Sequence, residues 1–170
     1  NTVLKTMRRK YTLEAYNEYL EQVVGSVPNM CVGTDVIVGF PGETDALFNQ
    51  TVDYLTHAPI HYFHVFSYSE RTMAHARKFD NKVPANKIKE RSAILRALSK
   101  EKWDKYRAQY KQEERLVLFE TTKGDDWVGS TEHFVKVKVK SNQSLKNKVH
   151  RAKLHTIDDT YVHGELLHGG

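Results

Sequence analysis

The stretch TDVIVGFPGET at residues 34–44 is the first candidate site of the chain. A run of apolar residues ends at Gly39, a Pro-Gly pair forms a turn, and the carboxylate of Glu43 follows. Ligands of α/β proteins bind at the carboxyl ends of parallel strands, where we expect this turn. Gly39 and Gly42 would let the backbone approach a ligand, and Glu43 would accept a hydrogen bond from it. The alternative is an ordinary turn in which Glu43 favours the start of the next helix.

Two basic segments are candidates for contacts with an anionic partner. In KTMRRKYT at residues 5–12, we expect Lys5, Arg8, Arg9 and Lys10 to lie in a loop, with Tyr11 beside them. Arginine binds phosphate in a bidentate manner, so one interpretation is phosphate contact, and the alternative is a solvated cluster ahead of a helix.

The second segment, FVKVKVK at residues 134–140, alternates with a period of two. Its valines would point to one face of a strand, and Phe134, Lys136, Lys138 and Lys140 to the other. A lysine row with an aromatic residue suits RNA phosphates and stacked bases. The alternative is protection of an exposed strand edge against aggregation. Further candidates for RNA contact near this face are Trp127, His133, Arg151 and Lys153.

Composition limits the class of protein. The chain has 170 residues, 39% apolar and 28% charged, with a net charge of +5, which fits one or two globular domains and weakly favours a nucleic-acid partner. The single cysteine, Cys31, excludes an internal disulfide, suits the reducing cytoplasm and is expected to be a packing residue. We expect no membrane span and no zinc site. Because the chain starts at Asn1 rather than Met, we expect a fragment.

The elements that position these residues follow from the hydrophobic pattern. Thr12 is expected to cap a helix that Gly25 and Pro28 end, and a second helix is expected to run from Thr44 to Pro59. Continuous apolar runs at 32–40 and 61–67 predict strands buried on both faces of a parallel sheet. Two strands do not complete such a sheet, so this part resembles the last third of a larger α/β barrel.

The second half of the chain has a different pattern. A long charged helix is predicted from 86 to about 112, with Ile88, Leu95 and Leu98 on its apolar stripe. Short strands are predicted at 116–119, 134–140, 150–156 and 161–167, which would form a small all-β module, possible as a closed barrel.

Three motifs together carry a family resemblance: VLKTMRRKYT at 3–12, TDVIVGFPGET at 34–44 and HVFSYSER at 64–71. In this order and spacing they resemble the radical S-adenosylmethionine (MiaB-like) tRNA methylthiotransferases, most of all the MtaB-like branch. The resemblance implies the end of a radical-SAM (TIM-like) barrel with a connecting helix at 1–112, and a TRAM-type β-barrel at 113–170. After Arg71 this chain has Thr-Met-Ala where the family has Pro-Gly-Thr, so no role is transferred to 72–74.

The resemblance also implies a function for the full-length parent. That enzyme would add a methylthio group to carbon 2 of threonylcarbamoyl-adenosine beside the anticodon, using S-adenosylmethionine and two 4Fe-4S clusters. Its partners would be the tRNA anticodon stem-loop and, for this fragment, the missing N-terminal portion. With a single cysteine the fragment lacks the cluster ligands and would be inactive alone.

The implied cofactor-binding residues form a wall at the ends of the two strands. They are Val36, Ile37, Gly39, Gly42, Glu43, Val65, Phe66 and Ser67. Two alternatives stay open: a methylthiotransferase that acts on a ribosomal-protein aspartate, and a stand-alone RNA-binding module.

Overall fold

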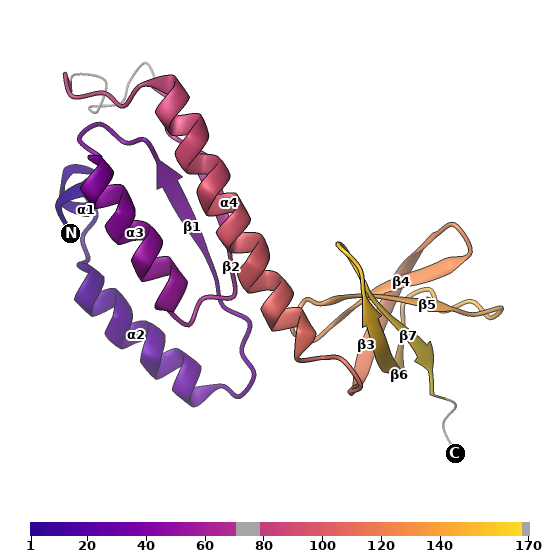
Figure 1. The fold of residues 1–170 in the computed structure, drawn as a ribbon. Helices are drawn as coiled ribbons and strands as arrows, with labels where there is room; N and C mark the ends of the chain where they lie inside the picture. Colours follow the sequence, from indigo (N-terminus) through magenta and orange to yellow (C-terminus); the bar gives the residue numbers. More distant parts are fainter. Residues whose placement is uncertain (71–78, 168–170) are drawn as a thin grey trace. The chain divides into compact units, whose positions relative to one another are not determined.

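The structure, a computed structural model, describes residues 1–70 and 79–167, and the chain divides into two compact units, Asn1–Lys102 and Trp103–Gly170 (Figure 1). The first unit alternates helices and strands and ends within the long helix α4. Its elements are α1 Thr2–Thr6, α2 Leu13–Ser26, β1 Gly33–Val38, α3 Asp45–His57, β2 Tyr62–Ser67 and the first part of α4, which spans Ala85–Ala108.

Threonine caps set the starts of two helices, as the sequence predicts. The Thr12 hydroxyl accepts from the Ala15 amide at 3.3 Å, and the Thr44 hydroxyl accepts from the Leu47 amide at 3.2 Å. These bonds satisfy amides that have no partner within the helix.

Helix α1 was not expected, because the sequence predicted a loop over these residues. The short helix depends on a tertiary contact: the side chain of Asn1 accepts from the Leu13 amide at 2.7 Å and donates to Glu14 at the start of α2. Lys5 therefore lies in the last turn of a helix, and the loop begins only after it.

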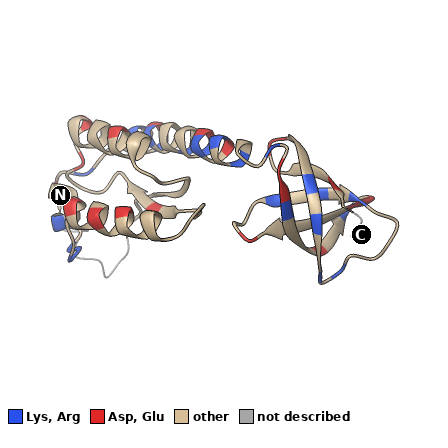
Figure 2. Ribbon diagram, turned by 90° about the horizontal axis from the view of Figure 1, so that it is seen from below, with Lys and Arg blue, Asp and Glu red and all other residues tan. Residues whose placement is uncertain are grey.

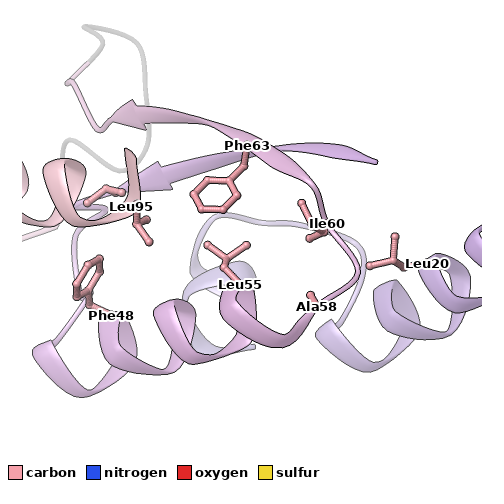
Figure 3. Packing of buried hydrophobic residues seen from close by; sticks show 8 residues of the cluster. Leu20, Phe48, Leu55, Ala58, Ile60, Phe63 and Leu95 are labelled. Carbon is pink, nitrogen blue, oxygen red and sulfur yellow. The ribbon is translucent and has the colours of Figure 1, made fainter. Parts of the chain in front are cut away.

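The sheet of the first unit consists of β1 and β2, which run parallel with Val36 opposite Val65 and Ile37 opposite Phe66. One face packs against helices α2, α3 and α4 through a cluster of buried side chains (Figure 3). The cluster contains Leu20, Val38, Phe48, Leu55, Ala58, Ile60, Phe63 and Leu95.

The other face of this sheet is open in the described residues, so the prediction that both strands are buried on both faces is wrong for this chain. Ile37 is 36% exposed and Phe66 is 52% exposed. The physical reason is that α2, α3 and α4 all contribute side chains to the same cluster, so none of these three helices covers the second face.

Helix α4 covers the outer edge of β2. The Ser99 hydroxyl accepts from the Phe63 amide and donates to the Phe63 carbonyl, both at 2.8 Å. About two turns of helix earlier, the Ser92 and Ser67 hydroxyls lie 3.0 Å apart. The Ser99 contacts satisfy backbone groups of Phe63 that a further strand would otherwise use.

The second unit contains a closed β-barrel with the strand order β3-β4-β5-β7-β6. This confirms the predicted small all-β module and its closure. Its interior is filled by apolar side chains from every strand, among them Val117, Phe119, Val135, Val137 and Leu154. The strands are β3 Glu114–Lys123, β4 Asp126–Thr131, β5 Lys136–Lys140, β6 Lys148–Ile157 and β7 Val162–Leu166.

Strand β4 was missed by the sequence analysis, because DWVGST shows little apolar alternation. Its Gly129 is required by close approach: a Cβ there would lie 2.3 Å from the Leu118 carbonyl oxygen of β3. An isolated glycine lowers strand propensity, so here the tertiary contact overrides the local signal.

The last turns of α4 belong to the second unit. The Trp103 and Tyr106 rings stack with centroids 5.5 Å apart, the hydroxyls of Tyr106 and Tyr110 lie 2.9 Å apart, and the Tyr110 ring lies 6.1 Å from that of His133. The helix ends at Ala108, before the predicted end, and Gln112 takes a positive φ of 70° so that its amide bonds to the Leu154 carbonyl. In the described ranges, no helix has the length and apolar character that a bilayer span requires.

A pH dependence follows from His61, whose ring Nδ1 accepts from the Val32 amide at 3.0 Å. Burial, and to a lesser extent Lys102, lowers the pKa of His61. The folded state therefore favours the neutral ring, and its stabilising effect is complete above the unfolded value of about 6.5 and is lost as the pH falls through the folded pKa. We predict that the protection factors of the β1 amides, which are exchange rates corrected for the intrinsic pH dependence of exchange, fall between pH 7 and 5.5 in the wild type.

The substitution His61→Gln keeps an acceptor without a titrating ring, so it should reduce this loss of protection. The matched control is His57→Gln, which removes an exposed histidine of α3. An NMR titration in which His61 titrates at or above 6.5, or an equal loss of protection in both variants, would contradict the assignment.

Candidate functional site

The turn after β1 is held by backbone geometry that requires glycine. Gly39 and Gly42 have φ values of +81° and +90°, and the Gly42 amide donates to the Asn81 carbonyl at 2.8 Å. A Cβ on Gly39 would lie 2.4 Å from Cγ1 of Ile88 on α4. The close approach at Gly39 is therefore to α4, whereas the sequence predicts an approach to a ligand.

Glu43 has a structural role that the sequence did not predict, while its contact with a ligand stays a prediction. Its carboxylate is buried, and Oε1 accepts from the Gly39 amide at 3.1 Å and from Arg91 Nη1 at 2.6 Å. Thr44, and not Glu43, caps α3. The glutamate is thus an internal brace of the turn.

Arg91 is the functional candidate that sequence reasoning missed. Its guanidinium also bonds to Asp45 at 2.6 Å and lies 5.1 Å from the centre of the Phe48 ring. Hydrogen bonds from Lys87 and then from Arg91 lower the pKa of Asp45. Because these partners lie more than forty positions apart in the sequence, no local motif could have connected them.

The proposed cofactor wall is divided between the two faces of the sheet. Val36 and Val65 pack against the core cluster, on the face that the helices cover. Ile37 and Phe66 lie opposite each other on the open face. Ser67 is bonded to Ser92, as described above. The open face therefore presents the side chains of Ile37 and Phe66, and residues 71 and 72–74 lie outside the described residues.

The open face also has a polar end. Asp35 and His64 are register partners there, and a recess of about 450 Å³ is lined by Arg9, Tyr11, Gly33, Thr34, Asp35, Tyr62 and His64. Arg9 thus lies beside the strands, while Arg8, with φ +58°, and Lys10 are exposed in the loop.

A second cavity, of about 240 Å³, lies along β1. Its lining combines α1 and α2 with the strand and α3, and includes Met7, Tyr16, Val36, Leu47 and Tyr54. Burial, followed by the neighbouring Tyr16, raises the pKa of Tyr54 to about 12, and the Tyr54 hydroxyl donates to Asn17 at 2.6 Å. Tyr54 is therefore a neutral hydrogen-bond donor inside the unit, not an acid–base group.

The lysines of β5 alternate with its buried valines, as predicted, and so lie on the outer face of the barrel. Figure 2 shows Lys and Arg positions alternating with other residues along a strand of the barrel. Two of its members have partners: Lys136 donates to the Ser130 hydroxyl at 2.8 Å, and Lys138 pairs with Asp126 at 2.9 Å. The Asp126 hydrogen bond raises the pKa of Lys138. Lys140 is exposed and outside these pairs.

The alternative of edge protection does not apply to β5. This strand is bonded to β4 on one side and to β7 on the other. A closed barrel has no free edge at this position, so the exposed lysines need another explanation.

The aromatic candidates differ in position. Phe134 is 74% exposed at φ +64°, next to the lysine row. Trp127 is the register partner of Val139, which is buried, so it shares the interior face of the barrel. His133 is partly buried, with its ring 6.1 Å from that of Tyr110.

The two basic candidates of β6 lie apart from the row. Arg151 pairs with Glu114 at 3.7 Å, and Lys153 is the register partner of Glu114. Strand β7 separates β6 from β5 in the barrel. The basic candidates therefore spread over more than one strand and alternate with carboxylates.

Comparison with known proteins places these features in a family. The chain is 34% identical over 172 aligned positions, 98% of its length, to the threonylcarbamoyladenosine tRNA methylthiotransferase MtaB of Bacillus subtilis, and 39% identical over 69% of its length to the MtaB protein of Aquifex aeolicus. It is 34% identical over 91% of its length to the tRNA-2-methylthio-N(6)-dimethylallyladenosine synthase of Geobacillus thermodenitrificans. The chain covers 38%, 29% and 31% of these relatives. No family model matches the chain.

The geometry at Gly39 predicts the effect of a single methyl group. Alanine there would adopt a left-handed φ, which costs about 1–2 kcal/mol, and would also collide with Ile88. We expect Gly39→Ala to lower the calorimetric melting temperature of the first unit. The control is Gly25→Ala within α2, where nothing lies within 4 Å of the added Cβ, and which should stabilise the helix by about 0.5–1 kcal/mol. A Gly39→Ala protein as stable as the wild type would refute this geometry.

Proposed function

Because the chain belongs to the tRNA methylthiotransferase family, we propose that it is the C-terminal part of an enzyme that adds a methylthio group to carbon 2 of an adenosine beside the anticodon. Threonylcarbamoyl-adenosine is the proposed substrate nucleoside. The observation that carries the proposal is the match to the Bacillus subtilis protein of that name, which extends over 98% of the chain. The activity, substrate and partners belong to the whole parent protein.

The two-stranded sheet supports a place at the end of a larger radical-SAM barrel. The outer edge of β2 is occupied by Ser99 of α4. In the residues that the structure describes, β1 has no strand on its other side, and the 240 Å³ cavity lies there. Further strands from the rest of the parent would therefore pair with β1.

The open face of the sheet supports S-adenosylmethionine as the ligand of this part. Ile37 and Phe66, exposed in register at the carboxyl ends of the strands, would pack against its adenine, and the braced turn would shape the end of the site. S-adenosylmethionine supplies the radical chemistry of the family.

The iron–sulfur clusters do not fit the residues of this chain. Its single cysteine is Cys31, and within the described ranges no group of three His, Cys, Asp or Glu could hold a metal. A 4Fe-4S cluster requires several thiolates, so the ligands would come from elsewhere in the parent.

The barrel surface supports tRNA as the partner of the second unit. Phe134 offers an exposed ring for a base, and Lys136 and Lys140 offer ammonium groups beside it. Single-stranded loops are the usual target of stacking aromatics, and an anticodon loop provides unpaired bases. Lys138 contributes less, because it is held by Asp126.

The alternative substrate, a ribosomal-protein aspartate, is not favoured. The relatives described above are all named as enzymes of tRNA. A stand-alone RNA-binding module is also less well supported, because the match includes the whole first unit.

The salt dependence of RNA affinity tests whether the lysines of β5 contact phosphates. Each phosphate contact to a single strand contributes about 0.7 to the slope of log affinity against log salt. We expect the double variant Lys136→Gln/Lys140→Gln to flatten the slope for an anticodon stem-loop by about 1.4, and Lys138→Gln to change it less. The control is Lys89→Gln on α4, in the first unit, which should leave the slope unchanged. Identical slopes for the double variant and the control would remove these lysines from the interface.

The ring of Phe134 has a separate test. Asparagine tolerates positive φ, so Phe134→Asn removes the aromatic surface while keeping the turn. We expect binding of the same stem-loop to weaken by about 1–3 kcal/mol with an unchanged salt slope. Tyr19→Asn, which removes an exposed ring of the first unit, is the control. Equal affinity of the Phe134 variant and wild type would show that the ring does not stack on RNA.

A further inference from the structure

We propose that Arg91 of α4 is a positioning residue that sets the turn after β1, and through it the S-adenosylmethionine site; this rests on the proposed function. The side chain is only 6% exposed. Its Nη1 donates to Glu43 Oε1 at 2.6 Å and to the Glu43 carbonyl at 3.0 Å, while Nη2 donates to Asp45 at 2.6 Å. One guanidinium therefore holds both residues that flank the Thr44 cap.

The connection from Arg91 to the end of β1 passes through a single oxygen. Oε1 of Glu43 receives both the Arg91 bond and the Gly39 amide at 3.1 Å. Gly39 is where the backbone leaves the strand with positive φ, directly after Ile37 and Val38. A shift of the Glu43 carboxylate would therefore release the peptide that precedes the turn.

A second contact from the same helix supports this assignment. Ile88, about one turn before Arg91 on α4, lies against Gly39 so closely that no Cβ fits between them. Helix α4 thus fixes the turn at two points, one apolar and one ionic. The open face with Ile37 and Phe66 begins at this turn, so its shape depends on a helix that contributes no side chain to that face.

The chemistry of the Arg91 guanidinium suits a role in positioning the turn better than a role in stabilising the fold. A planar guanidinium can bond two carboxylates and a carbonyl in fixed directions, which an ammonium cannot. Buried ion pairs often add little stability compared with apolar residues of similar volume, whereas removing one partner leaves a buried charge. Loss of Arg91 alone would therefore expel or reorient Glu43 and release Gly39.

The first experiment uses the 170-residue chain and follows the Gly39 amide by hydrogen exchange in NMR, with Gly129 of the barrel as internal reference. We expect Arg91→Met to accelerate Gly39 exchange by about ten- to a hundredfold, the range for loss of a hydrogen bond to a charged group. Arg91→Lys should fall between this variant and wild type. The matched control is Lys87→Gln, which removes an exposed ion pair to the other oxygen of Asp45, 2.7 Å away, and should leave Gly39 unchanged.

The double variant Glu43→Met/Arg91→Met separates positioning from stability. Because both charges are removed, it should recover the melting temperature lost in Arg91→Met while Gly39 exchange stays fast. If the double variant restores both quantities, or if Arg91→Met leaves Gly39 exchange at the wild-type rate, the proposal is wrong.

The second experiment uses the full-length parent with reconstituted clusters and measures S-adenosylmethionine binding by calorimetry. We expect the dissociation constant to rise in Arg91→Met and in the double variant, to stay at the wild-type value in Lys87→Gln, and the affinity for tRNA to be unchanged in all three. A wild-type parent that does not bind S-adenosylmethionine would refute the proposed function itself. A wild-type parent that binds, with equal affinity in the double variant, would refute only the role of Arg91.

Discussion

The contact of α4 with the end of β1 and the edge of β2 is the interaction on which the first unit depends. Ile88 and Arg91 hold the turn, Ser92 and Ser99 bond to β2, and Leu95 completes the core. A two-stranded parallel sheet has too little surface to bury its own faces. The helix supplies what the sheet lacks on one face and at one edge, and in the described residues the other face stays partly exposed and no strand pairs with the outer edge of β1.

The same helix continues into the second unit, where its last turns carry Trp103 and Tyr106, and Tyr110 follows just after its end. The barrel is otherwise self-contained, because closure pairs every strand on both sides. Closure of the barrel also changes how the exposed lysines of β5 are interpreted. With no edge to protect, lysines on β5 are available for ligands, but Asp126 and the other carboxylates between them limit how many are free. RNA recognition would then depend on a few exposed groups and on Phe134, not on a uniformly basic face.

The turn after β1 shows how one sequence motif can combine two physical demands. Its glycines were interpreted as an opening toward a ligand, yet Gly39 is required by Ile88 behind it. Its glutamate was interpreted as a ligand contact or a cap, yet it is the buried partner of Arg91. The motif is therefore largely a support, and the residues that face the open side are Ile37 and Phe66 of the strands themselves.

Much of the fold could be predicted from the sequence, because its signals are local. Threonine caps, apolar periodicity and the alternation of FVKVKVK depend on residues a few positions apart, and they placed α2, α3, both strands of the sheet, and the lysine face of β5. The family could also be recognised, since three motifs in order form a specific pattern. These features depend on short-range geometry and therefore need little information from the rest of the structure.

Only the tertiary structure decided the rest. In β4, Gly129 passes so close to β3 that no side chain fits, and α1 is tied through Asn1 to the start of α2. Val36 and Ile37 point to opposite faces because they are neighbours in a strand, but which face is covered depends on where the helices lie, and Arg91 reaches Glu43 across 48 positions. Such contacts join segments that the chain brings together only after folding. Their energies depend on burial and distance, and neither quantity can be read from residue types along the sequence.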